Sequence, residues 1–394
     1  MFTKDRWLLP EGIEEILPAE AKRFESMRRR ILDLFSAWGY ELVMPPLIEY
    51  LESLLTGVGK DMDLQTFKLT DQLTGRMMGV RPDMTPQAAR IDTHYLKRNT
   101  PVRLCYLGPV LRTRPDEFAG SREPLQLGAE LFGHAGPESD AEVLSLMITT
   151  LELSGIKDAH IDLGHVGVFR GLAALAGLNT EQEIELFDAL QRKAQSQAES
   201  LLDTCGATVK AKEMLLALLD LSGEAEVLDQ ARRLFKTAPK TVHDALDNLQ
   251  SVSTLVRQQL PEVRLYFDLA ELSGYHYYTG TVFSAFVPGH GRAIAKGGRY
   301  DGIGKSFGRD RAATGFGADL RQLLKFSTRG EEEIFGILAP HEDDAELRQE
   351  IARLRTRGER VVSQLPSDKA GAADLGCDRK LVRKNNRWVV EKIK

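Results

Sequence analysis

The sequence predicts an α+β protein in which helices flank an antiparallel sheet, with a helical insertion and a small C-terminal α/β domain. Over residues 125–132, apolar residues alternate with polar ones and place Gln126 and Glu130 together, which is the period-two pattern of a strand with two different faces. Between about residues 166 and 260, stretches rich in Ala, Leu, Glu and Gln carry helical spacing and few strand signals. A polar segment, Ser327–Glu333, separates the end of the chain from the rest.

These observations predict the domain organisation. We expect a main domain over residues 1–326, with a helical insertion over about 166–260, and a small α/β domain over 331–394. A chain of 394 residues is long enough for two or three domains with a substantial core.

The first half of the chain reads as helices and short strands. Apolar residues at helical spacing predict an amphipathic helix over 19–38, which Gly39 ends. The strands that follow are expected at Tyr40–Met44 before Pro45, at Phe67–Leu69 and Arg76–Val80 as a hairpin, and at Val102–Leu107 before the strand at 125–132; a helix is expected from Gln87.

The second half begins with the insertion, in which helices are expected over Thr180–Leu202 and Ala211–Leu219. Strands are expected at Val263–Leu272, Tyr275–Phe286 and Arg292–Lys296, followed by a glycine-rich corner at Gly297–Gly302 and by Gly315–Leu324 as the beginning of the last helix. The small domain is expected to hold a strand at Ile334–Leu338, a helix near Ala345–Arg357, a strand at Arg360–Ser363 and a hairpin that turns on Asn385-Asn386.

Residues 379–394 hold seven basic side chains and one acidic one. Two interpretations remain open for this hairpin. It is either a phosphate-binding edge or a charged edge that blocks strand-to-strand aggregation, and we favour the second.

Composition excludes several classes of protein. The net charge of −5 gives no electrostatic sign of a nucleic-acid partner. The three cysteines are far apart and near no histidine cluster, so neither a zinc site nor a disulfide framework is expected. The N-terminus lacks the apolar stretch of a signal peptide, and no apolar run approaches membrane-spanning length. We therefore expect a cytoplasmic protein.

A candidate binding site centres on the strand at 125–132. Gln126 and Glu130 share one face, and Gly128 between them leaves room beside an amide and a carboxylate. Arg112 ends the preceding strand, with Arg114 and Arg122 on the loop. These groups predict a pocket for a small polar cation, with Arg112 placed for a carboxylate or phosphate. The alternative is a solvated hairpin with ordinary surface charges.

Five motifs occur in an order that carries a resemblance. They are RPDMT at 81–85, Arg112, the pair Gln126 and Glu130, HYYTGTVF at 276–283, and GGRYDG at 297–302. Over about residues 1–325 the chain resembles the catalytic domain of class II aminoacyl-tRNA synthetases, specifically histidyl-tRNA synthetase.

The resemblance implies a histidine-binding pocket. It assigns Asp83 and Thr85 to the amino group of histidine, Arg112 to the α-phosphate of ATP, and Gln126 and Glu130 to the amino-acid pocket. It also places the paired tyrosines and the tyrosine of the glycine-rich corner around the imidazole: Tyr277, Tyr278 and Tyr300.

Three departures separate the chain from an active synthetase. Ser273 occupies the position of an arginine that stabilises the developing charge of adenylate formation, and loss of such a group typically costs orders of magnitude in rate. Gln322 occupies the position of the arginine for the γ-phosphate, and the adjacent Arg321 points about 100° away on a helix. Only about 60 residues follow the linker, which is short for an anticodon-binding domain.

This pattern of a kept pocket and lost catalysis resembles the regulatory-subunit family of ATP phosphoribosyltransferase, a paralogue of histidyl-tRNA synthetase. The resemblance implies a non-catalytic, allosteric subunit without cofactor, metal or tRNA. It also implies a homodimer core in a hetero-octamer with four short catalytic subunits, which performs the first step of histidine biosynthesis under feedback inhibition by histidine. The alternatives are a divergent histidyl-tRNA synthetase and a stand-alone synthetase paralogue. The sequence leaves open whether histidine binds in the pocket or at the partner interface.

Overall fold

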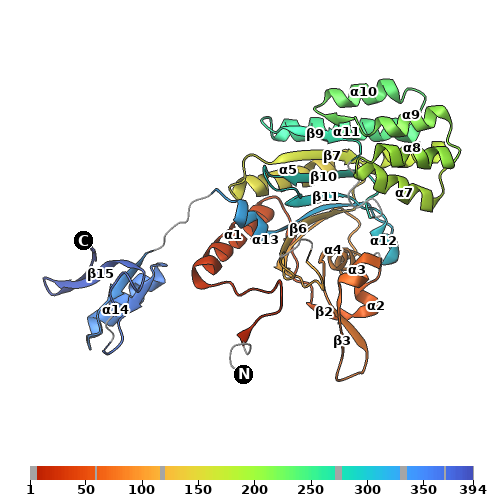
Figure 1. Ribbon diagram of the computed structural model, residues 1–394. Coiled ribbons are helices and arrows are strands. Elements are labelled where there is room, and N and C mark those ends of the chain that lie inside the picture. Colours follow the sequence, from red (N-terminus) through yellow and green to blue (C-terminus); the bar gives the residue numbers. More distant parts are fainter. Residues whose placement is uncertain are drawn as a thin grey trace. The chain divides into compact units, whose positions relative to one another are not determined.

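Two units make up the chain in the computed structural model, Met1–Arg329 and Gly330–Lys394 (Figure 1). The structure describes residues 7–57, 60–115, 120–270, 277–328, 335–367 and 370–393, without the side chains of Lys60 and Asp61. Each unit has its own sheet and its own apolar core.

A nine-stranded sheet forms the centre of the first unit. Its spatial order is β1 (Glu41–Leu42), β5 (Val102–Pro109), β6 (Leu125–Phe132), β12 (Ala313–Asp319), β11 (Ala295–Arg299), β10 (Thr281–Phe286), β7 (His160–His165), β9 (Leu265–Asp268) and β8 (Ser222–Gly223). The pairs from β5 across to β7 are antiparallel, whereas β1 pairs with β5 and β7 with β9 in parallel. The antiparallel core of the sheet confirms the predicted fold class.

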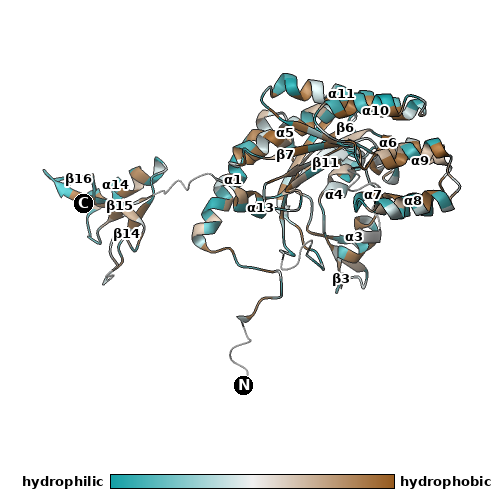
Figure 2. Cartoon of the chain, turned by 45° about the horizontal axis from the view of Figure 1, so that its top comes forward, coloured by the Kyte–Doolittle hydropathy of each residue, from teal (hydrophilic) through white to brown (hydrophobic). Residues whose placement is uncertain are grey.

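The two faces of β6 enter two different cores, as its alternation predicted. Leu127, Ala129 and Leu131 pack into the larger core. The helices on that face are α1 (Pro18–Ala37), α5 (Pro137–Leu153), α11 (Lys240–Gln259) and α13 (Leu320–Phe326). Phe132 faces a smaller core that is closed by α4 (Thr85–Arg90), a π-helical turn at Ile91–Leu96, and α12 (Ile303–Ser306). Figure 2 shows the largely apolar colouring of the strands between these layers.

A three-stranded sheet lies in the first unit beside α4 and carries the predicted hairpin. Its order is β2 (Ile48–Tyr50), β4 (Met77–Val80) and β3 (Phe67–Thr70), with α2 (Leu51–Leu54) and α3 (Lys60–Gln65) in the connection. The Asp71 carboxylate accepts from the backbone N–H of Leu73 and the hydroxyl of Thr74, which closes the hairpin turn.

The insertion is helical, as expected, but its first long helix is divided. The helices before α11 are α6 (Val166–Ala176), α7 (Thr180–Gln191), α8 (Gln195–Thr204), α9 (Val209–Ala217) and α10 (Glu226–Leu234). The expected continuous helix over Thr180–Leu202 is wrong, because Lys193 adopts φ 51° and ends the first segment.

Two expectations near the glycine-rich corner are also wrong. The segment from Gly315 does not begin a helix, because Ala313–Asp319 is strand β12 and the helix starts at Leu320. Gly297 and Gly298 lie within β11 rather than in a corner after it. The glycines are there because neighbouring groups occupy the space above the strands: a Cβ on Gly297 would lie 2.3 Å from the ring of Phe283.

The second unit matches the predicted small α/β domain. Its four-stranded sheet has the order β14 (Val361–Ser363), β13 (Gly336–Ala339), β15 (Cys377–Lys384) and β16 (Arg387–Lys392), and it packs against α14 (Ala345–Thr356). Asn385 and Asn386 turn the hairpin with φ of 49° and 63°, the left-handed conformation of a type I′ turn. In the described parts of both units, no helix is long and apolar enough to cross a membrane.

Candidate functional site

The turn that precedes α4 is fixed by a side chain of the sheet. Gln126 on β6 accepts the backbone N–H of Met84 at 2.9 Å and donates to Asp83 Oδ1 at 2.8 Å. The same Oδ1 accepts the backbone N–H of Thr85 at 2.8 Å. Gln126 therefore positions the acidic turn, and Asp83 Oδ2 accepts no hydrogen bond from any described residue.

Glu130 is the most enclosed acidic group of the site, with 1% of its surface exposed. Tyr106 of β5 donates to Glu130 Oε1 at 2.8 Å, and the hydroxyl of Tyr300 donates to Oε2. The Thr85 hydroxyl lies 2.9 Å from the Tyr106 hydroxyl, which makes a hydrogen-bonded chain from the turn to the carboxylate. The site is thus connected through side chains from three separate parts of the chain.

Two glycines make room for this chain of hydroxyls. Gly128 pairs with Tyr106 across β5 and β6, and a Cβ there would lie 2.4 Å from the Tyr106 hydroxyl. Gly315 of β12 pairs with Glu130, and its Cβ would lie 1.5 Å from Glu130 Oε2. The space expected above Gly128 is therefore occupied by the Tyr106 ring, and the buried carboxylate depends on a glycine opposite it.

The aromatic residues of the site gather beside Glu130. The rings of Tyr277 and Tyr300 stack with centroids 5.0 Å apart, and Tyr278 meets Tyr277 edge-on at 5.3 Å. Tyr300 is buried, whereas Tyr277 keeps 36% of its surface exposed. Tyr277 therefore forms the outer aromatic surface of the site.

Arg112 lies beyond the end of β5 rather than on the strand. Its Nε donates to the carbonyl of Pro82 at 3.3 Å, and its own carbonyl accepts from Arg122 Nε at 3.2 Å. Arg112 thus borders the same acidic turn that Gln126 holds. All eight predicted site residues belong to the described residues: Asp83, Thr85, Arg112, Gln126, Glu130, Tyr277, Tyr278 and Tyr300.

The electrostatics of the site disfavour ionisation of Glu130. Burial raises the pKa of Glu130 to about 8, although the hydrogen bonds from Tyr300 and Tyr106 act in the opposite direction. No Lys, Arg or His of the described residues forms an ion pair with Glu130 or Asp83. A cation placed here would stabilise the ionised carboxylate.

Sequence reasoning missed three residues that build the site. In the sequence, Tyr106 is indistinguishable from the apolar residues of its strand. Only its position opposite Gly128, which the structure shows, indicates a role in the site. Arg81 is buried and donates to the carbonyls of Pro45 and Pro109, which anchors the turn. Arg170 of the insertion donates to the Tyr278 carbonyl at 3.0 Å. Such contacts across the fold leave no local pattern in the sequence.

The residues behind the predicted departures from a synthetase are Ser273, Gln322 and Arg321. Ser273 lies in 271–276, outside the described residues. Gln322 lies on α13 and is half-buried. The Arg321 guanidinium lies over the ring of Phe24 at 5.9 Å, so it faces α1.

Comparisons with known proteins cover nearly the whole chain. The family model "Histidyl-tRNA synthetase" matches residues 12–323, and the model "ATP phosphoribosyltransferase subunit HisZ C-terminal domain" matches residues 334–391. The chain is 55% identical over 392 residues to the ATP phosphoribosyltransferase regulatory subunit of Thioalkalivibrio sulfidiphilus, with 99% of each chain covered. It is 53% identical to the protein of the same name in Alkalilimnicola ehrlichii, with 100% of this chain and 99% of that one covered.

Solved structures with a similar fold come from the same two groups of proteins. A Bacillus halodurans structure described as an ATP phosphoribosyltransferase regulatory subunit/histidyl-tRNA synthetase has a TM-score of 0.82 at 29% identity, with 93% of this chain and 95% of that chain covered. Histidyl-tRNA synthetase from Nostoc has a TM-score of 0.79 at 22% identity, with 96% and 91% covered, and shares the fold.

Proposed function

The chain belongs to the family of ATP phosphoribosyltransferase regulatory subunits, and from this premise we propose that it has no catalytic activity of its own and transmits feedback inhibition by histidine to a catalytic partner. The match of residues 334–391 favours this function over that of a divergent histidyl-tRNA synthetase. The partner is a short-form transferase subunit, whose chemistry this chain supports in the first step of histidine biosynthesis.

The observation that carries the histidine proposal is the burial of Glu130 without a cationic partner among the described residues. A carboxylate with 1% exposure and no cationic partner among the described residues is costly to keep ionised. Histidine offers two groups that relieve this cost, its ammonium and its imidazole. The ligand therefore supplies the positive charge that the protein does not.

The arrangement around Glu130 can hold both ends of histidine. Asp83 Oδ2 accepts from the amino group, while Glu130 and its two tyrosine hydroxyls face the imidazole. Arg112, beside the same turn, is placed for the carboxylate of the ligand. Tyr277 stacks over Tyr300 at the outer side, where a planar ring can pack.

Calorimetric titration with histidine tests this site. We expect Glu130→Ala to weaken binding by about 2 kcal/mol or more, since a hydrogen bond to a charged group is lost. In the reconstituted complex the same variant should keep basal transferase activity and lose feedback inhibition. Glu350→Ala, at a half-buried position of α14 in the second unit, is the control. Unchanged affinity and unchanged feedback in Glu130→Ala would contradict binding in this pocket and place regulation at the partner interface.

The absence of catalysis has its own test. Because Ser273 and Gln322 replace the two arginines of an active synthetase, histidine-dependent ATP–pyrophosphate exchange should stay near background. Ser273→Arg alone should not restore it, since Gln322 still leaves the γ-phosphate without an arginine. Exchange at the rate of an active synthetase in the unmodified chain would favour the alternative function.

Assembly is proposed as a homodimer within a hetero-octamer of four chains of each kind. Apolar side chains lie exposed around the edge strand β1 and the Pro45-Pro46 bend, namely Leu42, Met44, Leu47 and Ile48. Exposed apolar groups gathered in this way are typical of a surface that another chain covers. Analytical ultracentrifugation of the chain alone should show a dimer, and Met44→Glu should shift it toward monomer. A monomer at micromolar concentration in the unmodified chain would contradict the proposal.

A further inference from the structure

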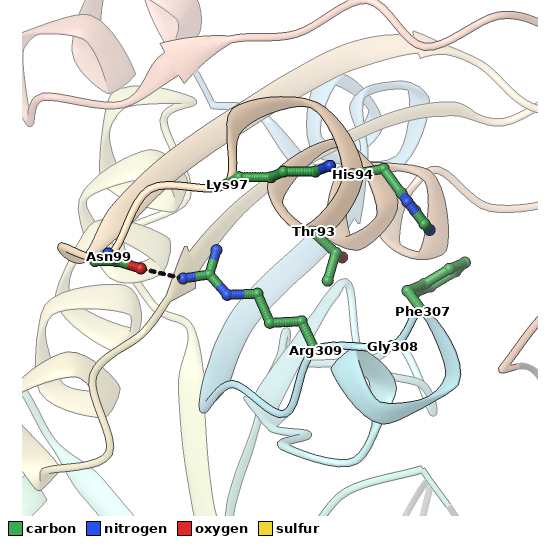
Figure 3. Close-up of a pocket in the computed structure, with 7 residues that line it drawn as sticks. All are labelled: Thr93, His94, Lys97, Asn99, Phe307, Gly308 and Arg309. Atoms are coloured by element: carbon green, nitrogen blue, oxygen red, sulfur yellow. Dashed lines mark hydrogen bonds between the residues drawn. The ribbon is translucent and has the colours of Figure 1, made fainter.

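A pocket lined by cationic side chains lies apart from Glu130, near the end of the π-helical turn (Figure 3). Its volume is about 510 Å³. One wall comes from the π-helical turn and the loop after it, and the other from the segment that follows α12. The lining residues are Thr93, His94, Lys97, Asn99, Phe307, Gly308 and Arg309.

Charges around this pocket do not balance. Three of the nearby cations are paired: Arg98 with Glu41, Arg311 with Asp92, and Lys305 with Asp310. Lys97 and Arg309, which line the pocket, form no ion pair with any described residue. Two positive charges therefore face the pocket without an ion-pair partner among the described residues, and Asp92, whose carboxylate interacts electrostatically with Arg309, is buried and paired with Arg311.

The Arg309 guanidinium is held in place at the pocket wall. Its Nη2 donates to the Arg98 carbonyl and to Asn99 Oδ1, both at 2.8 Å, and Figure 3 shows the second bond. The remaining N–H groups of this guanidinium donate to none of the described residues. A positioned guanidinium binds carboxylates and phosphates well, because several of its N–H groups point in a fixed direction toward two oxygens of the ligand.

His94 and Phe307 form the less polar side of the pocket. Their rings meet edge-to-face with centroids 6.3 Å apart. Phe307 is buried, whereas His94 is exposed. The pocket thus combines positive charge on one side with an aromatic surface on the other.

The backbone at this pocket departs from regular geometry. The Lys97 N–H bonds to the Asp92 carbonyl at 2.9 Å, five residues back, and Lys97 itself adopts φ 50°. A left-handed conformation is unfavourable for lysine, and single π-helical turns occur frequently at functional sites. The fold therefore maintains an unfavourable backbone at the residue that presents one of the two unpaired cations.

We propose that this pocket binds the phosphate group of a phosphorylated small molecule. Arg309 supplies a fixed donor set, Lys97 a mobile point charge and His94 a further donor. The cavity has the size of known small-molecule sites, and the ring of Phe307 offers contact to the rest of the ligand. This site shares no lining residue with the Glu130 site and does not depend on the function proposed for that site.

The test uses the full chain with pyrophosphate, inorganic phosphate and AMP as probes, in low-salt buffer, by calorimetry and by ³¹P NMR line broadening. We expect saturable binding of at least one probe that weakens as salt is added. Lys97→Gln should weaken that binding roughly tenfold, because one charged hydrogen bond is lost. Gln has no branched Cβ and Lys97 is exposed, so the variant should keep the circular-dichroism spectrum and melting temperature of the unmodified chain.

Two matched variants locate the site. Lys305→Gln removes the same charge from α12, outside the lining residues, and should change affinity less than twofold. Arg112→Gln should also leave phosphate binding intact. Loss of binding in Arg112→Gln but not in Lys97→Gln would overturn the proposal, because it would place the anion beside the Glu130 pocket. Absence of binding by all three probes at millimolar concentration would overturn the proposal as well. This holds even if Lys97→Gln impairs association with the catalytic chain, because that result would mean that the pocket receives a carboxylate of a partner protein.

Discussion

Two buried carboxylates in the first unit are neutralised in different ways. Asp140, fully buried in the first turn of α5, pairs with Arg299 through contacts of 2.9 Å from Nη2 to Oδ1 and 3.1 Å from Nε to Oδ2. Glu130 is almost equally buried, and among the described residues it accepts hydrogen bonds from the hydroxyls of Tyr106 and Tyr300 but has no cationic partner. The negative charge of Asp140 is therefore balanced by a cation of the protein, whereas no cation among the described residues would balance a charge on Glu130.

The contrast arises at a single dipeptide. Arg299 is the last residue of β11 and Tyr300 follows it, so their side chains project to opposite faces of the sheet. Arg299 reaches the α5 side, where it also donates to the carbonyls of His134 and Gly136, while Tyr300 reaches Glu130. One motif therefore secures the fold on one face and supports a ligand site on the other.

The largest effect is expected from removal of the Arg299 charge. We expect Arg299→Met to lower the free energy of unfolding by about 3–5 kcal/mol, because it leaves the buried Asp140 charge without a partner. Urea denaturation measures the loss. Arg353→Met is the control, since the Arg353–Glu350 pair lies at the surface with Arg353 exposed and should contribute less than about 1 kcal/mol. Similar losses in the two variants would show that the buried pair has no special structural role.

A smaller effect is expected on the Glu130 side from Gly315→Ala. The new methyl group would overlap Glu130 Oε2, so the carboxylate or β12 must move. Overpacking of this kind typically costs about 1–3 kcal/mol of stability. Histidine affinity should fall together with stability, as seen by calorimetry and urea denaturation. Gly302→Ala, where a Cβ meets nothing within 4 Å, is the control and should leave both unchanged.

The sequence predicts the position of Glu130 better than that of the Asp140–Arg299 pair. Alternation along 125–132 places Gln126 and Glu130 on one face, because side-chain direction in a strand follows directly from position. The same local rule identifies the hairpin at Asn385-Asn386 and the helix α1. These features depend on neighbours in the sequence, and the structure confirms them.

The failures come from contacts between distant segments. Gly315 was expected near the start of a helix. The structure shows that the position needs a glycine because the Glu130 carboxylate, on a neighbouring strand, occupies the space of a side chain. Arg299 was predicted only to belong to a glycine-rich corner. Its ion pair could not be predicted, because the partner Asp140 is 159 positions away in the sequence. The cationic pocket at Lys97 and Arg309 was not predicted, because its two walls are about 210 residues apart.

The raised pKa of Glu130 also makes the stability of the folded chain depend on pH. The pKa of Glu130 is about 8 in the folded chain against an ordinary value of 4.5, so the folded state binds a proton that the unfolded state releases. Its contribution to stability is therefore present below about pH 4.5 and is lost as pH rises through 8. The slope from this group is at most about 1.4 kcal/mol per pH unit.

Urea denaturation without histidine at several values from pH 5.5 to 8.5 measures this slope. Glu130→Gln should flatten it, and saturating histidine should do so in the unmodified chain. Glu350→Gln should leave the slope unchanged, because Arg353 lowers the pKa of Glu350 and it titrates below this range. A slope that persists in Glu130→Gln would mean that another group carries the pH dependence.

The smallest expected effect concerns Thr85, whose hydroxyl lies 2.9 Å from that of Tyr106 at the start of the chain of hydroxyls that ends on Glu130. Thr85→Val keeps the shape of the side chain and removes the hydrogen bond. The loss should weaken histidine binding by about 1 kcal/mol, or roughly fivefold, the usual contribution of one neutral hydrogen bond. It should also raise the pKa of Glu130, since the Thr85 hydrogen bond acts to lower it. Thr85→Ser keeps the hydroxyl and should bind histidine as the unmodified chain does. If Val and Ser weaken binding equally, the Thr85 methyl group contributes by packing, and the chain of hydroxyls does not tune the carboxylate that the ligand meets.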